Sequence, residues 1–295
     1  MIIAILILLI LSLLFVVLIL FIGNKKKSEE EYYEEVRNPF VMQILVPREN
    51  EKASLAAEQM FASIHGILED YKKCPDVVSF EIVSSEENGI KFYVVAPEHL
   101  SRFIEGQIYA QYPNADIKYV NDYTKEEERE ETFITTGEIE MEKDYIFPIK
   151  TFMSFEVDPL AAITGALSEL NRGERAWIQI IVRPVSNYWQ ERAKRYITAI
   201  REGKNPYGST FWSFVSSLFA GVGKALTESS TNKVQKQVVK LSPGQEEELK
   251  EIEKKMLKVG FEFRIRVVTK ADTQLRSEQI LRDIVASFKQ FRLHI

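Results

Sequence analysis

Hydrophobic residues follow two different spacings along the chain, and the order of these spacings predicts the fold. Over residues 40–122, short apolar runs of strand length alternate with longer segments in which apolar residues recur at helical spacing. The strand-like runs are 41–46, 78–83, 90–95 and 116–120, and the helical segments are 54–71 and 97–112. The second and third runs flank Asn88-Gly89, a dipeptide typical of β-hairpin turns. The order β-α-β-β-α-β predicts a ferredoxin-like unit.

A second block, residues 133–295, repeats part of this order. An alternating run at 133–143 is typical of an exposed strand and precedes the unit. The three strands predicted for the unit itself are 151–157, 176–184 and 261–269, and its helices follow the N-cap candidates Asp158 and Asp272. Residues 187–259 separate the second and third strands of the unit and are predicted to be an inserted helical segment, whose last helix begins at a capping box of Ser242 and Gln245. A fourth strand would begin only near residues 291–295. The second unit is therefore predicted to lack its last strand and to leave an open sheet edge.

The start of the chain has a third pattern, because residues 2–22 are apolar apart from Ser12. Such a run spans about 30 Å as a helix, the thickness of a hydrocarbon core. No basic residue precedes it and no small-x-small cleavage site follows it, so residues 1–23 are predicted to be an uncleaved anchor rather than a signal peptide. The residues that define the anchor are Ile2 and Phe21 near its ends and the cluster Lys25, Lys26 and Lys27 behind it.

The lysine cluster also predicts the topology, because positive residues remain on the cytoplasmic side of a membrane. We therefore expect a single-pass protein of the bacterial cytoplasmic membrane, with its N-terminus outside and its soluble region in the cytoplasm. Charged segments then divide the soluble region. Residues 24–39 are predicted to be a spacer, 40–122 a first domain, 123–132 a linker, and 133–295 a second α+β domain.

Composition and motifs argue against an enzyme. The net charge is −5, and Cys74 is the only cysteine, so a disulfide within the chain is excluded. The three histidines are far apart, which makes a zinc site improbable. The segment 220–226, AGVGKAL, has neither the preceding glycine nor the following Ser or Thr of a phosphate-binding loop. We predict no catalytic residue, no cofactor and no metal.

Three segments are candidates for contact with other molecules. The helix at 97–112 carries Gln107, Tyr109, Gln111 and Tyr112, which suit a domain or subunit interface, although they also suit plain helix surface. A helical pattern at 209–226 carries Phe211, Trp212 and Phe219, which suit packing on this protein or a partner, or contact with a membrane. Residues 172–204 contain an excess of Arg and Lys with interleaved aromatic residues, so binding of nucleic acid is an alternative to simple surface charge.

Several of these stretches resemble a known family. AAEQMFASIHGI (56–67) and IEGQIYAQYP (104–113), with DPLAA, AWIQIIVRP and ASFKQF further on, are similar to bacterial membrane proteins in which an anchor and a soluble region precede a type IV secretion or conjugative coupling ATPase module. The resemblance covers residues 40–291. It implies a non-catalytic assembly module that serves DNA or protein transfer, with an ATPase or further copies of itself as partners. This sequence contains no Walker motifs, so ATP hydrolysis does not carry over, and a stand-alone membrane scaffold or adaptor is the alternative.

Overall fold

The computed structural model describes most of the predicted soluble region. The described residues are Phe15 and the ranges 39–47, 54–67, 77–125, 132–206 and 241–291. The anchor residues Ile2, Phe21, Lys25, Lys26 and Lys27, and the contact candidates Phe211, Trp212 and Phe219, lie outside them. None of the helices in these ranges is both long and apolar enough to cross a membrane. The described part is a mixed α+β structure, which confirms the predicted class.

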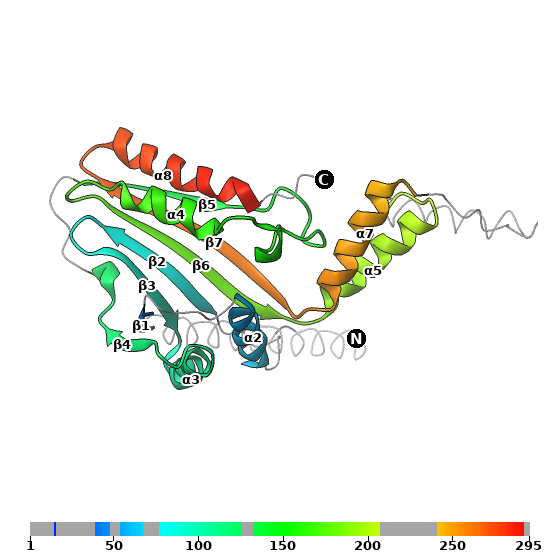
Figure 1. Cartoon of the computed structure of the whole chain (residues 1–295), viewed down its shortest axis with the longest axis horizontal. Coiled ribbons are helices and arrows are strands. Elements are labelled where there is room, and N and C mark those ends of the chain that lie inside the picture. Colours follow the sequence, from blue (N-terminus) through cyan, green and yellow to red (C-terminus); the bar gives the residue numbers. More distant parts are fainter. Residues whose placement is uncertain are drawn as a thin grey trace, which may run out of the picture. The chain divides into compact units, whose positions relative to one another are not determined.

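A seven-stranded antiparallel sheet forms the centre of the structure (Figure 1). Its strands are β1 (Phe40–Leu45), β2 (Val78–Ser85), β3 (Gly89–Ala96), β4 (Asp116–Val120), β5 (Phe133–Ile139), β6 (Arg175–Val185) and β7 (Gly260–Ala271). They lie in the order β4-β1-β3-β2-β6-β7-β5, which makes β4 and β5 the two edges. The β2–β3 turn contains Gly89 at φ 64°, as the Asn88-Gly89 pair predicts.

The two predicted units share this one sheet, which the sequence analysis did not anticipate. Strand β2 pairs with β6 along its whole length, with Val83 opposite Trp177. The predicted linker between separate domains therefore joins the two edges of a single sheet. Its described start, the short helix Tyr123–Lys125, lies on one face of the sheet, where the ring of Tyr123 is 5.0 Å from that of Tyr93 on β3.

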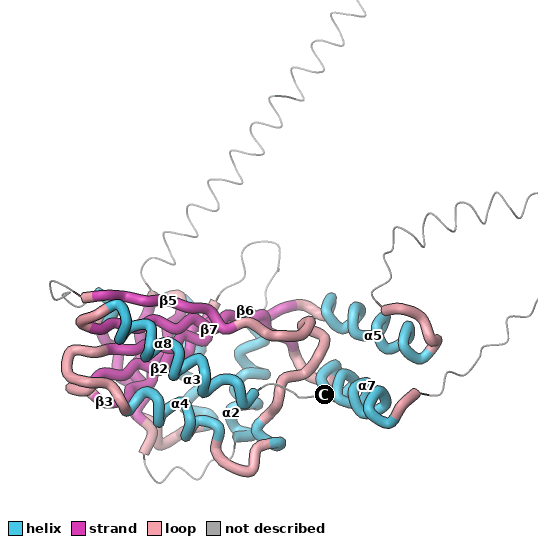
Figure 2. Tube along the Cα trace, turned by 90° about the horizontal axis from the view of Figure 1, so that it is seen from above, coloured by secondary structure: helices cyan, strands magenta, loops and turns pink. Residues whose placement is uncertain are grey.

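Four helices cover the opposite face of the sheet, as Figure 2 shows. They are α2 (Ser54–Ile64), α3 (Ser101–Gln111), α4 (Pro159–Ser168) and α8 (Gln274–Phe288). Met60 and Ile64 of α2, with Ile104 and Ile108 of α3, are buried against β1, β2 and β3. The apolar stripes predicted from helical spacing thus form the core on this side, although Phe103, an apolar residue of the predicted helix 97–112, is 37% exposed.

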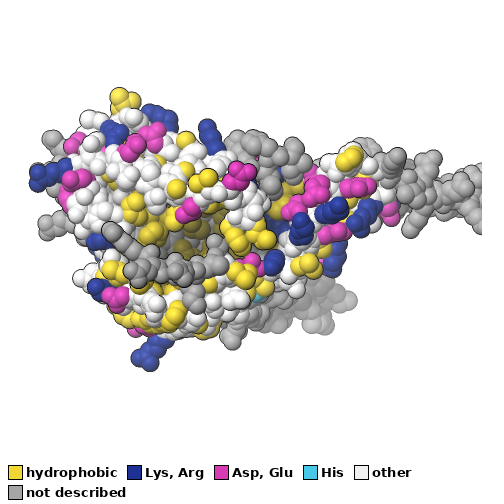
Figure 3. Space-filling model, in the orientation of Figure 1, with side chains coloured by type: hydrophobic (Ala, Val, Ile, Leu, Met, Phe, Trp, Pro, Cys, Tyr) yellow, Lys and Arg dark blue, Asp and Glu magenta, His cyan; other side chains and the backbone are white. Residues whose placement is uncertain are grey.

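Between these helices, hydrophobic side chains gather in the middle of the helix-covered face (Figure 3). Aromatic residues from three elements meet on this side of the sheet. The ring of Phe61 lies 5.0 Å from that of Phe80 on β2 and 6.0 Å from that of Phe261 on β7. His65 contacts the Phe261 ring and lies 3.1 Å from the carbonyl oxygen of Val185, so it is a packed core-edge residue.

Helix ends agree closely with the sequence signals. Asp158 caps α4, because its carboxylate accepts a hydrogen bond from the N–H of Leu160 at 2.9 Å. Ser242 and Gln245 form the predicted capping box at the start of α7 (Pro243–Met256). The N-cap of α8 is Thr273 rather than Asp272, one residue later than predicted.

The strand predicted at 151–157 is wrong. This segment contains a short 3-10 helix, Phe152–Ser154, followed by bends that lead to the α4 cap. Its apolar residues resemble a strand pattern, yet Met153 and Val157 are among the most exposed hydrophobic residues described. The first strand of the second block is β5 instead, which pairs with β7 from Phe133 opposite Ala271 to Ile139 opposite Ile265.

Helices α5 (Tyr188–Arg201) and α7 (Pro243–Met256) belong to a second compact unit, made of 141–151, 186–260 and 291–295. Ala193 and Ile197 of α5 pack against Leu249 and Ile252 of α7, together with two residues of the 141–151 segment. The ammonium group of Lys255 donates to the carbonyl oxygens of two residues in that segment, at 2.6 and 3.0 Å. Burial lowers the pKa of Lys255, while the charge of Asp144 opposes this shift.

Candidate interaction edge

Strand β5 is an edge strand with the features of a binding site for another strand. Among the described residues it pairs only with β7, so alternate N–H and C=O groups of its seven residues point away from the described sheet. Its sequence, FITTGEI, contains no Lys and no Pro, the residues that commonly prevent pairing at exposed edges. Phe133 and Ile134 are 46% and 48% exposed.

The opposite edge, β4, shows the contrast. It is only five residues long and carries Asp116 and Lys118, which form an ion pair at 3.4 Å. Short length and charge discourage pairing with a further strand. Its Tyr119 turns to the helix-covered face, where the ring meets that of Phe40 at 4.7 Å and the hydroxyl donates to Glu105 of α3. Of the two edge strands described, β5 is the longer, has Glu138 as its one charged side chain, and exposes Phe133 and Ile134.

Helix α8 lies against β5 and fixes its position. Gly137 of β5 faces Leu281 of α8 closely enough that a Cβ there would sit 3.3 Å from the leucine methyl groups. A hydroxyl network adds polar contacts between the strands and the helix. Ser277 donates to Thr135 at 2.9 Å, and Thr269 of β7 donates to the Ser277 carbonyl oxygen at 2.8 Å. The side of β5 that faces away from β7 is thus presented by a well-anchored strand.

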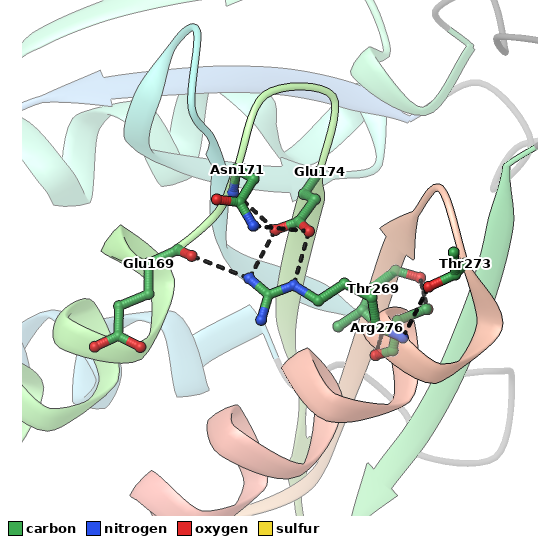
Figure 4. Close-up of polar contacts among 7 residues, drawn as sticks. Glu169, Asn171, Glu174, Thr269, Thr273 and Arg276 are labelled. Carbon is green, nitrogen blue, oxygen red and sulfur yellow. Dashed lines mark hydrogen bonds and ion pairs between the residues drawn. The ribbon is translucent and has the colours of Figure 1, made fainter.

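An ion pair holds the start of α8 to the turn between α4 and β6 (Figure 4). The guanidinium of Arg276 donates to both carboxylate oxygens of Glu174, at 2.7 and 2.9 Å, and to the carbonyl oxygen of Glu169 at 3.2 Å. Asn171 donates to the same carboxylate from its backbone and its side chain. Burial would raise the pKa of Glu174, but the hydrogen bonds from Arg276 and Asn171 outweigh it and hold this pKa below its usual value.

A second buried carboxylate lies on the face without helices. Glu81 of β2 accepts hydrogen bonds from Ser79 at 2.7 Å, from Gln179 at 3.1 Å and from the hydroxyl of Tyr123. No basic group contacts it among the described residues, so burial raises the pKa of Glu81 despite these three bonds. The contact with Tyr123 ties the segment that leaves β4 to the middle of the sheet.

Sequence comparison places the chain in a family. A family model described as "Domain of unknown function (DUF8128)" matches residues 23–293. The chain belongs to this family. Searches of curated proteins and of solved structures gave no significant match.

In this DUF8128 domain, the four candidate residues at α3 are all at least partly accessible. Tyr109 is 37% exposed, and Gln107, Gln111 and Tyr112 are half-buried. Tyr112, which directly follows α3, also packs against the core formed by α2, α3 and the first strands, and burial raises its pKa. A contact surface formed by these residues stays a prediction.

The basic segment 172–204 of the DUF8128 domain is largely neutralised. On α5, Lys194 pairs with Glu191 at 2.7 Å, and Arg201 pairs with Glu253 at 2.7 Å. The side chain of Arg192 pairs with Asp144. On β6, Arg183 pairs with Glu262 of β7. Binding of nucleic acid through this segment stays an untested prediction, with fewer unpaired charges than the sequence suggested.

The described ranges were also searched for clusters of metal-ligating side chains. No group of three His, Cys, Asp or Glu residues in them is placed to hold a metal ion. Glu174 and Arg276, the strongest polar cluster, were not candidates in the sequence analysis, because they lie 102 residues apart. In the sequence, the polar residues at 171–174 before β6 indicated a turn but not its partner on α8. In the structure this turn is present, and Gly173 adopts φ 87° in it.

Proposed function

We propose that this chain is a non-catalytic, membrane-anchored assembly module that serves a type IV secretion or conjugative transfer ATPase. In this proposal the soluble region contains two ferredoxin-like units, and the second lacks its fourth strand. The strand order supports this view, because β4-β1-β3-β2 matches a complete unit and β6-β7-β5 matches one without its last strand.

The open β5 edge is the observation that carries the proposal. In a complete second unit the fourth strand would lie beside β5, as β4 lies beside β1. An exposed strand of this kind is a common site for protein association through strand addition. The resemblance of residues 40–291 to proteins that carry a transfer ATPase module supplies the class of partner. A stand-alone membrane scaffold without a transfer ATPase is the alternative.

Affinity purification of the tagged full chain from membranes, with identification of the co-purified chains, tests the proposal. We expect a chain with Walker motifs in the eluate, and ATP hydrolysis that depends on that chain. Two variants at the sheet edges test whether β5 carries the contact. Thr136→Lys on β5 should reduce the recovery of that chain, whereas Val120→Lys on β4 should leave the recovery unchanged. Recovery of scaffold proteins without any ATPase would favour the alternative, and ATP turnover by the isolated chain would refute the non-catalytic assignment.

The predicted anchor requires its own test. A phosphatase that is active only outside the cytoplasm should be inactive when fused after Ile295, and a cytoplasmic reporter at the same place should be active. The reverse result would contradict the predicted orientation.

A further inference from the structure

The two halves of the sheet are built from the same series of elements, and this allows one half to serve as a template for the other. The series β1-α2-β2-β3-α3 corresponds to β5-α4-β6-β7-α8, apart from the helical insertion between β6 and β7. The order of the strands in space also corresponds, because β1-β3-β2 matches β5-β7-β6. Only β4 has no counterpart in the described residues.

The template shows what β4 contributes beside β1. It runs antiparallel to β1, with Tyr119 opposite Met42 and Lys118 opposite Gln43. Ile117 and Tyr119 point to the helix-covered face, where both β1 and α3 contact them. Lys118 points to the other face. The strand therefore alternates an apolar or aromatic side over the helices with a polar side on the open face.

Phe133 marks the corresponding empty position on β5. Strand β1 begins with Phe40, which packs with the core under the helices. Strand β5 begins with Phe133, which lies on the same side of its strand as Thr135 and Gly137, the residues that contact α8. The Phe40 ring is covered by Tyr119 of β4 at 4.7 Å. Phe133 has no ring partner in the ranges that the structure describes, and 46% of it is exposed. The partner of β5 is thus missing at the place where an aromatic residue covers Phe40.

We infer that an extended segment of another polypeptide completes the second unit by pairing antiparallel with β5. The segment carries alternating residues, apolar toward α8 and polar toward the open face. It places an aromatic or large apolar residue opposite Thr135, where that residue covers Phe133 as Tyr119 covers Phe40. This inference deepens the proposed function, on which it rests, by defining the chemistry of the partner at the β5 edge.

A peptide made from the template provides a direct probe. It has the sequence Asn114–Asn121 of this chain and is compared with the same peptide in which tyrosine is replaced by serine. The full chain in detergent is mixed with each peptide, and hydrogen exchange of 133–139 and of 116–120 is followed by mass spectrometry. We expect the native-sequence peptide to slow exchange in β5 and to leave β4 unchanged, because β4 is short and charged.

Three changes should weaken this binding in a defined order. Thr136→Lys on β5 should abolish it, whereas Val120→Lys on β4 should retain it. Phe133→Ser in the protein, or serine for tyrosine in the peptide, should each weaken it about three- to tenfold, the value of one aromatic contact. The two changes combined should cost little more than either alone, since they remove the same contact.

Other outcomes would overturn the inference. Slow exchange of β5 in the chain without peptide would mean that this chain itself fills the edge, and the measured mass would tell whether one copy or two are involved. Binding that ignores both Phe133→Ser and Thr136→Lys would place the peptide elsewhere. Failure to recover a transfer ATPase from membranes would refute the proposed function but would leave the peptide result unchanged, so the two failures are distinguishable.

Discussion

Replacement of Glu174 by Gln should destabilise the sheet unit, because it removes the charge that Arg276 and Asn171 are arranged to bind. Each carboxylate oxygen of Glu174 receives one hydrogen bond from Arg276 and one from Asn171. A glutamine keeps one oxygen, so in either orientation its NH₂ group faces two donors. Breaking a fully buried pair costs about 3–5 kcal/mol. We expect about 2–3 kcal/mol here, because the Arg276 side chain is 28% exposed and water can reach it.

Urea unfolding at pH 7.5 and at pH 4 measures this loss. The control is Glu169→Gln, since that residue offers Arg276 its backbone carbonyl and its side chain is exposed. The folded pKa of Glu174 is depressed, so its contribution is complete above the pKa of an unfolded glutamate and is lost as the pH falls through the folded value. The difference between wild type and Glu174→Gln should therefore shrink at low pH. Equal stability of the Glu174 and Glu169 variants at pH 7.5 would refute the reasoning.

The remaining predictions concern other parts of the chain. Glu81→Gln should stabilise the protein at pH 8. The folded pKa of Glu81 is raised, so the stability that this residue contributes is present at low pH and is lost as the pH rises. Unfolding measured from pH 8 down to pH 4 should show the stability difference between the variant and the wild type shrinking toward pH 4. Gly260→Ala should cost about 1–3 kcal/mol in thermal unfolding, because its Cβ would overlap the buried indole of Trp189, whereas the control Gly244→Ala meets no atom. The purified chain should show no ATP turnover above a buffer control. Lysine at Thr136 should abolish peptide pairing without lowering the unfolding midpoint, since that side chain is exposed.

Local signals in the sequence predicted local structure well. The Asp158 and Ser242 caps, the Asn88-Gly89 turn and the apolar stripe of α3 each depend on residues within one or two turns, so a short window contains the needed information. The strand prediction for 151–157 was wrong because it, too, used only a short window of the sequence. Its alternating apolar residues suit a strand, but tertiary structure gives the corresponding place in the sheet to β5, which a short window cannot reveal.

The pairing of strands that lie far apart in the chain could not be predicted from the sequence. The contact between β2 and β6 joins Val78 with Val182 across a hundred residues, and both strands read equally well as parts of separate sheets. The Glu174–Arg276 cluster has the same character, because each residue alone is an ordinary surface charge in the sequence. An open edge in the second block was expected from the strand count, but its place at β5 was not, because the first strand of that unit was predicted at 151–157.

The position of β5 in the sheet bears on how the proposed module would work. The predicted anchor is followed by the spacer and then by β1, which lies beside the edge strand β4. Five strand intervals separate β1 from β5, about 24 Å at the usual spacing of neighbouring strands. A partner strand at β5 would therefore add to the sheet far from the strand that follows the anchor. The two edges also differ in sequence: β4 is short and carries Asp116 and Lys118, whereas β5 is longer, lacks Lys and Pro, and is held from one face by α8, so β5 is the edge better suited to the proposed strand addition.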